Sequence, residues 1–180
     1  MRITKENTTA LLIDFQERLF PAMDEKEGLV KNTKMLIEGL QLLGIPVAFT
    51  QQYTKGLGET LEEIRSLVPN FKAIEKTDFS CCGADEYQTF LNQNLSKTII
   101  LCGIEAHVCV LQTAVDLKEA GYNPIVVTDC ITSRSAISKE SALDRFRYEN
   151  IMMVTCETIL FELTRSAKAE EFRAISKLVK

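Results

Sequence analysis

The feature that most constrains the fold of this chain is a regular alternation of short apolar runs with amphipathic segments. The clearest run is KTIILCGI at residues 97–104, which is rich in β-branched and aliphatic residues. Continuous runs of this kind are typical of parallel strands that are buried on both faces. Between the runs, apolar residues recur at helical spacing. The alternation therefore predicts an α/β fold in which helices cover both faces of a mostly parallel sheet.

The pattern predicts about six strands and the helices that connect them, in a Rossmann-like three-layer sandwich. No internal repeat or linker interrupts it, so we expect residues 1–180 to form a single domain. The glycine-containing segment 53–59 is the best candidate for a mobile flap. Strands are expected near 9–15, 46–50, 72–75, 97–104, 124–129 and 151–155, and helices at 29–43, just after 60, and at 84–93, 107–120, 138–149 and 156–180.

The charge balance argues against two classes of partner. The chain carries 21 Lys and Arg against 25 Asp and Glu, for a net charge of −4. Nucleic acids and anionic membranes are bound through basic surfaces, so neither is expected as a partner. The apolar runs are too short to span a bilayer, and the first 15 residues lack the apolar run of a secretory signal. We therefore expect a cytoplasmic protein.

The six cysteines do not form a metal-binding or disulfide pattern. No CxxC pair occurs, and the chain has a single histidine, so the usual zinc ligand sets cannot be completed. Disulfide frameworks belong to short secreted chains, so we expect free thiols. Most would be small buried hydrophobic residues. Nucleotide-binding glycine motifs and a GxSxG elbow are also missing from the sequence.

Three complementary side chains follow predicted strands. Asp14 comes after the first strand, Lys76 after the third, and Cys109 after the fourth, near the start of a helix. Ligands of parallel α/β sheets bind at the carboxyl ends of the strands. A carboxylate can accept a proton from a thiol, a lysine can hold the carboxylate, and a helix N-terminus favours a thiolate. A competing reactive thiol is Cys130, which also lies at a strand end.

The only histidine, His107, lies two residues before Cys109 and suggests a cysteine–histidine dyad. If a helix begins near residue 107, the two positions differ by about 200° around its axis. Side chains two residues apart do not face each other on a helix, so a direct dyad is disfavoured. His107 instead falls in the apolar arc of the helix, which makes it a candidate for the wall of a pocket.

The residues described above resemble the isochorismatase-like cysteine hydrolase family, which includes nicotinamidases and carbamoylases. The resemblance extends from about residue 8 to residue 165 and is strongest toward the isochorismatase domain-containing proteins. The matching segments are ALLIDFQ, EKTDFS, LCGIEAHVCVLQTA, GYNPIVVTDC and SRS.

This resemblance implies a mechanism for the three side chains. Asp14 would be the general base, Lys76 would support it, and Cys109 would attack a carbonyl carbon to form an acyl-enzyme. The resemblance also implies a cis peptide bond between Ile104 and Glu105. The backbone N–H groups of Glu105 and Cys109 would form the oxyanion hole.

The segment after the second strand departs from the family pattern. Metal-binding nicotinamidases carry Asp and His ligands there, whereas this chain has Gln51, Gln52 and Tyr53. We therefore expect neither a metal nor another cofactor. Because isochorismatase proper lacks the nucleophilic cysteine, cleavage of a vinyl ether is not expected. The expected substrate is a small molecule with an amide, ureido or related acyl bond. Its pocket is predicted to include Phe15, Phe20, Gln52, Tyr53, Phe79 and His107.

The resemblance also implies an oligomeric state. Family members are usually dimers or larger, so a homo-oligomer is expected.

Two other functions are left open besides that of a hydrolase. The altered segment after the second strand allows a catalytically silent binding or scaffold protein of the same fold. The six cysteines allow a thiol-based redox protein.

Overall fold

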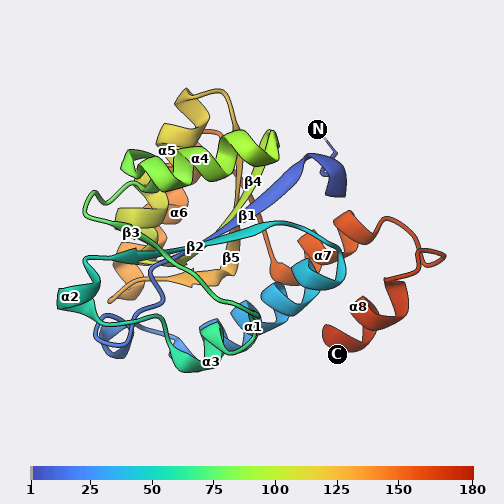
Figure 1. Ribbon diagram of the computed structural model, residues 1–180, viewed down its shortest axis with the longest axis horizontal. Helices are drawn as coiled ribbons and strands as arrows, with labels where there is room; N and C mark the ends of the chain where they lie inside the picture. The colour runs from blue at the N-terminus through green and yellow to red at the C-terminus, as the bar shows by residue number, and fades with distance from the viewer. Residues whose placement is uncertain (1) are drawn as a thin grey trace.

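A computed structural model describes residues 2–180 and shows a six-stranded sheet in which all neighbouring strands are parallel (Figure 1). The order of the strands across the sheet is β3-β2-β1-β4-β5-β6. The predicted α/β architecture is confirmed. The strands are β1 (Thr8–Ile13), β2 (Val47–Gln52), β3 (Ile74–Lys76), β4 (Thr98–Ile104), β5 (Asn123–Thr132) and β6 (Met152–Val154).

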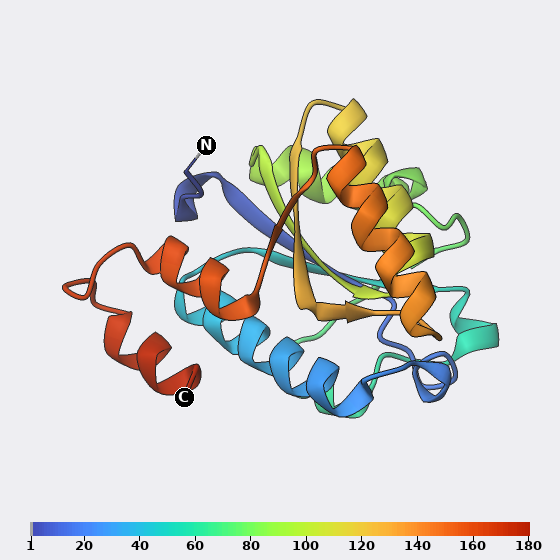
Figure 2. The same cartoon turned by 180° about the vertical axis from the view of Figure 1, so that it is seen from behind.

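Helices cover both faces of the sheet (Figures 1 and 2). On one face, α1 packs against β5 and contacts α3, α7 and α8; on the other, α5 packs against β5 and contacts α6, and α4 lies beside them. The α-helices are α1 (Lys26–Leu42), α2 (Thr54–Leu57), α3 (Glu62–Arg65), α4 (Asp85–Asn94), α5 (Leu111–Glu119), α6 (Ala136–Tyr148), α7 (Cys156–Thr164) and α8 (Phe172–Leu178). Short helical turns are η1 (Lys5–Asn7), η2 (Phe20–Ala22), η3 (Cys81–Gly83) and the π-helical η4 (Ala106–Val110).

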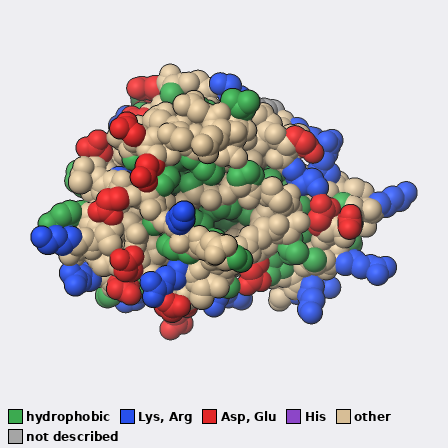
Figure 3. All heavy atoms as spheres, in the orientation of Figure 1, with side chains coloured by type: hydrophobic (Ala, Val, Ile, Leu, Met, Phe, Trp, Pro, Cys, Tyr) green, Lys and Arg blue, Asp and Glu red, His purple; other side chains and the backbone are tan. Residues whose placement is uncertain are grey.

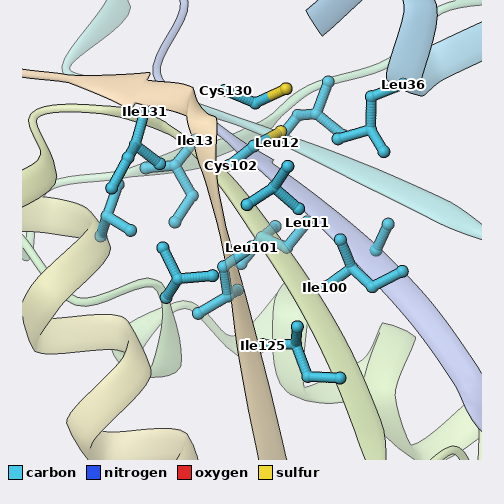
Figure 4. Close-up of a cluster of buried hydrophobic side chains, with 14 of the residues drawn as sticks. Leu11, Leu12, Ile13, Leu36, Ile100, Leu101, Cys102, Ile125, Cys130 and Ile131 are labelled. Carbon is cyan, nitrogen blue, oxygen red and sulfur yellow. The ribbon is translucent and has the colours of Figure 1, made fainter. Parts of the chain in front are cut away.

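The central strands form the core because their side chains are apolar on both faces. Every residue of β1 and β4 is buried. Figure 4 shows side chains of β1, β4 and β5 packed together, with the Cys102 and Cys130 thiols among them on the side of Leu36. Helix α1 approaches α7 closely at Gly39, where a Cβ atom would lie 2.4 Å from a methyl carbon of Leu160. The described structure has free thiols at all six cysteines, as expected.

The strand order creates a switch point between β1 and β4. From β1 the chain moves outward through β2 and β3, and then returns to place β4 on the other side of β1. At the carboxyl ends Ile13 lies opposite Gly103. Gly103 has φ +132°, and a Cβ atom there would lie 2.2 Å from the carbonyl oxygen of Ile13. Only glycine fits this approach, which brings together the two strand ends where such sheets bind ligands.

Two segments differ from the predicted elements. The tail at 156–180 is not one helix, because α7 ends at Thr164, just before Arg165 with φ 66°, and α8 starts only at Phe172. The segment 53–59 contains α2, and it is fastened to the chain after β1. The Gln16 amide donates to Gly58 O, and the Arg18 N–H donates to Leu57 O.

The surface carries charges of both signs. In the view of Figure 3, acidic and basic side chains surround a hollow lined by apolar side chains. No helix among residues 2–180 is long and apolar enough to cross a membrane.

Candidate active site

The carboxylate of Asp14 is fixed at the end of β1. Its backbone adopts the left-handed region, with φ 56°, which Asp tolerates better than most residues. The side chain is fully buried, and the Thr50 hydroxyl donates to Asp14 Oδ1 at 2.7 Å. The partner is set by the strand register, because Thr50 lies opposite Ile13 across β1 and β2. The second oxygen, Oδ2, faces Lys76 Nζ at 2.7 Å.

The ammonium group of Lys76 joins the three predicted side chains. It lies at the end of β3, and only 1% of its side chain is exposed. Besides Asp14, Nζ contacts Gln52 Oε1 at 2.6 Å, and two backbone carbonyl oxygens of the following loop at 3.2 and 3.3 Å. Its distance to Cys109 Sγ is 3.6 Å. The ammonium therefore bridges the carboxylate and the thiol. The three groups come from segments at the ends of three different strands.

Cys109 lies in a π-helical turn rather than in a regular first turn of α-helix. In η4 the N–H groups of Val108 and Val110 both donate to Glu105 O. The peptide bond between Ile104 and Glu105 is cis. Cys109 is 5% exposed, so the thiol lies just beneath the surface beside Lys76. π-helical turns inside α-helices occur frequently at functional sites.

The protonation of Cys109 differs from the expectation. Burial, followed by the neighbouring Asp14 carboxylate, raises the pKa of the Cys109 thiol to about 12, although Lys76 opposes both effects. The predicted effect of a helix N-terminus does not prevail, because loss of hydration and a nearby carboxylate act against the thiolate. Burial also opposes the charge of Lys76, but Asp14 and the nearby thiols outweigh it, so the pKa of Lys76 is raised. The resting site holds a neutral thiol.

His107 and Cys109 have different partners. The His107 Nδ1 atom lies 2.9 Å from Ser133 Oγ, whereas Cys109 Sγ lies beside Lys76. Close to them, Arg134 is held by Glu105. Both the backbone N–H and the Nε of Arg134 donate to Glu105 Oε2, at 3.1 and 3.0 Å.

Residues 8–158 match the family model of the isochorismatase domain, which covers most of the chain. The chain belongs to the isochorismatase family. Isochorismatase domain-containing protein 2 of Danio rerio is 34% identical over 178 residues, which cover 99% of this chain and 89% of the relative. The recognition of the family from its motifs is therefore confirmed.

Solved structures of isochorismatase-fold proteins show the same architecture. The MAR1 ribonuclease from Caenorhabditis elegans has a TM-score of 0.94 and 32% identity, covering 99% of this chain and 92% of that one. The ycaC gene product of Escherichia coli, described as an octameric hydrolase of unknown specificity, has a TM-score of 0.93 and 22% identity. That alignment covers 99% of this chain and 89% of the other.

The other residues predicted for the substrate pocket differ in how far they are exposed to solvent. Tyr53 and Phe79 are 52% and 54% exposed. Phe20 and His107 are half-buried, whereas Phe15 is enclosed in the core. The Gln52 side-chain amide accepts a hydrogen bond from Lys76 and is therefore part of the site itself.

Two cavities adjoin the cluster. One of about 170 Å³ is lined by Lys76 and Thr77, and one of about 380 Å³ by Phe79 and Gln112, among others. A larger cavity of about 780 Å³ lies between α1, β5 and α6, and its lining includes none of the three central side chains. The candidate site is therefore the one at Lys76, where the three side chains meet.

Cys130 and Cys81 are more deeply buried than Cys109, whereas Cys82 is half-buried and its pKa is raised by burial to about 11. Cys130 is fully buried, and burial raises its pKa well above the usual value. Cys81 lies behind the site, 3.8 Å from Thr50 Oγ1, and burial raises its pKa to about 12. Among residues 2–180, no three His, Cys, Asp or Glu side chains gather as a metal site. The expectation that the protein works without a metal stays a prediction.

The sequence alone did not identify two supporting residues. Thr50 holds the Asp14 carboxylate, and Gln16 holds the backbone of residue 52. Thr50 could be found only from the pairing of β1 with β2. Gln16 had one visible signal, which is an amide directly after the strand that carries Asp14.

Proposed function

We propose that this protein is a cysteine hydrolase that cleaves an amide, ureido or related acyl bond of a small molecule. The observation that carries the proposal is the position of the Lys76 ammonium, 2.7 Å from the Asp14 carboxylate and 3.6 Å from the Cys109 thiol. A nucleophile, a base and an orienting cation in mutual contact are the parts that acyl transfer needs. Membership of the isochorismatase family supports a hydrolase.

The first half of the reaction forms an acyl-enzyme. Because the thiol is neutral at rest, its proton moves to Asp14 as Sγ attacks the substrate carbonyl carbon. The S–C bond forms, the C–N bond breaks, and the leaving nitrogen takes the proton from Asp14. Lys76 stays protonated and offsets the negative charge that passes from the carboxylate to the sulfur.

The second half releases the acid. Asp14 takes a proton from a water molecule, whose oxygen attacks the thioester carbon. The S–C bond breaks, and the sulfur recovers the proton from Asp14. In both halves the carbonyl oxygen becomes negative, and we assign its stabilisation to the backbone N–H groups of Glu105 and Cys109.

The binding pocket is assigned to the surface around Lys76. Exposed aromatic side chains at Tyr53 and Phe79 suit a flat or apolar group on the substrate. Phe20 and His107 would add to the wall of the pocket. Gln52 and Phe15 would support this wall from the protein interior. The Arg134 guanidinium, with 62% of its side chain exposed, is held by Glu105, the residue that precedes η4.

We also propose a homo-oligomer, a cytoplasmic location and activity without a metal or other cofactor. The related Escherichia coli protein is an octamer, and the six free thiols suit a reducing compartment. Light scattering after gel filtration measures the oligomer. Dialysis against a chelator, followed by the activity assay, tests the cofactor prediction, and lost activity that zinc restores would refute it.

A screen of small amides, ureides and activated esters tests the function. We expect turnover that Cys109→Ala abolishes and Cys130→Ala leaves unchanged. An RNA oligonucleotide belongs in the same screen, because the Caenorhabditis elegans relative is called a ribonuclease. Cleavage of RNA alone would overturn the proposal.

The alternatives predict other results. A scaffold protein would show no turnover and equal thiol reactivity in wild type and in Asp14→Asn. A redox protein would show reversible oxidation of Cys109 without hydrolysis of any compound in the screen.

A further inference from the structure

Both polar atoms of the Gln52 side-chain amide bond to groups of the site. Its Oε1 accepts from Lys76 Nζ at 2.6 Å, and its Nε2 donates to the Thr77 carbonyl oxygen at 2.6 Å. The two bonds tie the end of β2 to the end of β3, and the amide oxygen holds the ammonium group there.

The backbone of Gln52 is held in turn by a buried amide. Gln16, which is fully buried, accepts from the Gln52 N–H at 2.7 Å and donates to the Gln52 carbonyl at 3.1 Å. The same Nε2 also donates to Gly58 O at 2.7 Å. Gln16 thus occupies both backbone groups of residue 52, as a neighbouring strand would. This fixes the backbone position from which the Gln52 side chain reaches Lys76.

We propose that Gln52, clamped by Gln16, is a positioning residue that holds the Lys76 ammonium between Asp14 and Cys109. The inference rests on the proposed function, because it concerns the reactivity of the same thiol. An ammonium has three N–H groups, and one directed to Gln52 fixes the directions of the others.

The neutral charge of Gln52 is part of this role. The charged groups at the thiol are Asp14 from β1 and Lys76 from β3, and Cys81 from η3 is a further titratable group beside them. A neutral acceptor holds the ammonium without adding a second carboxylate near the sulfur. A carboxylate in its place would bind Lys76 but oppose formation of the thiolate.

The test uses alkylation of Cys109 by iodoacetamide, followed by peptide mass spectrometry in the full-length protein. Gln52→Glu keeps the size and an acceptor for Lys76, whereas Gln52→Met keeps the size and loses the acceptor. Gln51→Met is the matched control, because Gln51 is the adjacent residue of β2 and bonds to Glu59 instead. Thermal unfolding of each variant is measured in parallel.

We expect the two Gln52 variants to rank in one order by the rate of Cys109 alkylation and in the opposite order by melting temperature. Gln52→Glu should slow alkylation of Cys109 about tenfold, because a like charge a few ångströms away shifts a pKa by about one unit or more. Gln52→Met should slow it on the order of threefold, the effect of one lost hydrogen bond. Gln52→Glu should nevertheless melt at or above Gln52→Met. The control should react as wild type does.

Two results overturn the inference, and they are distinguishable. If the closer isostere Gln52→Glu reacts faster than Gln52→Met, Gln52 has only a structural role, and the proposed function stands. If Cys109 of the wild type reacts no faster than the other thiols, both this inference and the proposed function fail.

Discussion

Removing one partner of the buried Asp14–Lys76 pair should cost far more stability than removing both. At 2.7 Å, with an effective dielectric constant of about 20, the attraction is about 6 kcal/mol. Burial of the two side chains, 0% and 1% exposed, removes hydration worth several kcal/mol for each ion. The attraction and the lost hydration nearly cancel, so the intact pair adds little net stability.

Breaking the pair leaves one buried charge without compensation. We therefore expect Lys76→Met and Asp14→Asn each to lower the free energy of unfolding by about 3–5 kcal/mol. The double variant should lose clearly less than the sum of the two. All three variants should lack activity, because the proposed mechanism uses both groups.

Urea unfolding at one fixed protein concentration measures these free energies. The exposed pair of Arg147 and Asp144 is the control, because its atoms lie 2.6 Å apart but its side chains are 62% and 78% exposed. Removing either member should change the free energy of unfolding by less than about 1 kcal/mol. Additive losses in Lys76→Met and Asp14→Asn, or losses no larger than in the control pair, would show that the buried pair is not coupled in this way.

Four other substitutions have definite expected outcomes. Gly103→Ala should lower the melting temperature and abolish activity, since its Cβ would lie 2.2 Å from Ile13 O. Gly28→Ala should instead raise the free energy of unfolding by about 0.5–1 kcal/mol, because a Cβ at this position of α1 meets open space. Burial raises the pKa of Cys109 from 9.0 to about 12, so the folded state holds a proton that the unfolded state releases above pH 9. Its stabilising contribution should therefore be complete below pH 9 and decline toward pH 12, and urea unfolding of Cys109→Ala should show a smaller decline than wild type; an equal decline contradicts this. Tyr87→Phe should leave the melting temperature unchanged or raise it, because the buried hydroxyl has no hydrogen-bond partner among residues 2–180, and a marked fall would show a missed partner.

The sequence predicted the sheet well because burial on both faces leaves a direct trace. The run at 97–104 became β4 with every residue from Thr98 to Ile104 buried. The gathering of Asp14, Lys76 and Cys109 at one edge was also predictable, because parallel strands place their carboxyl ends at one edge. Whether the three side chains meet depends on the strand order. Here β1 lies between β2 and β4, and β3 lies beside β2, so the strand ends that carry them are close together.

Features that depend on packing were not predictable in the same way. The pKa of Cys109 is set by burial and by a carboxylate 95 residues earlier in the chain, so the local helix signal gave the wrong direction. The support of Asp14 by Thr50 depends on the register of two strands. The break between α7 and α8 follows from the left-handed backbone at Arg165, a residue type that does not signal a helix end.

In the proposed mechanism Asp14 and Lys76 make Cys109 the nucleophile that is acylated. Peptide mass spectrometry after brief incubation with p-nitrophenyl acetate tests this directly. We expect one acetyl group, on Cys109, which is lost in Asp14→Asn and unaffected by Cys130→Ala. Acetylation spread over several thiols, or equal labelling of Cys109 with and without the Asp14 carboxylate, would contradict it.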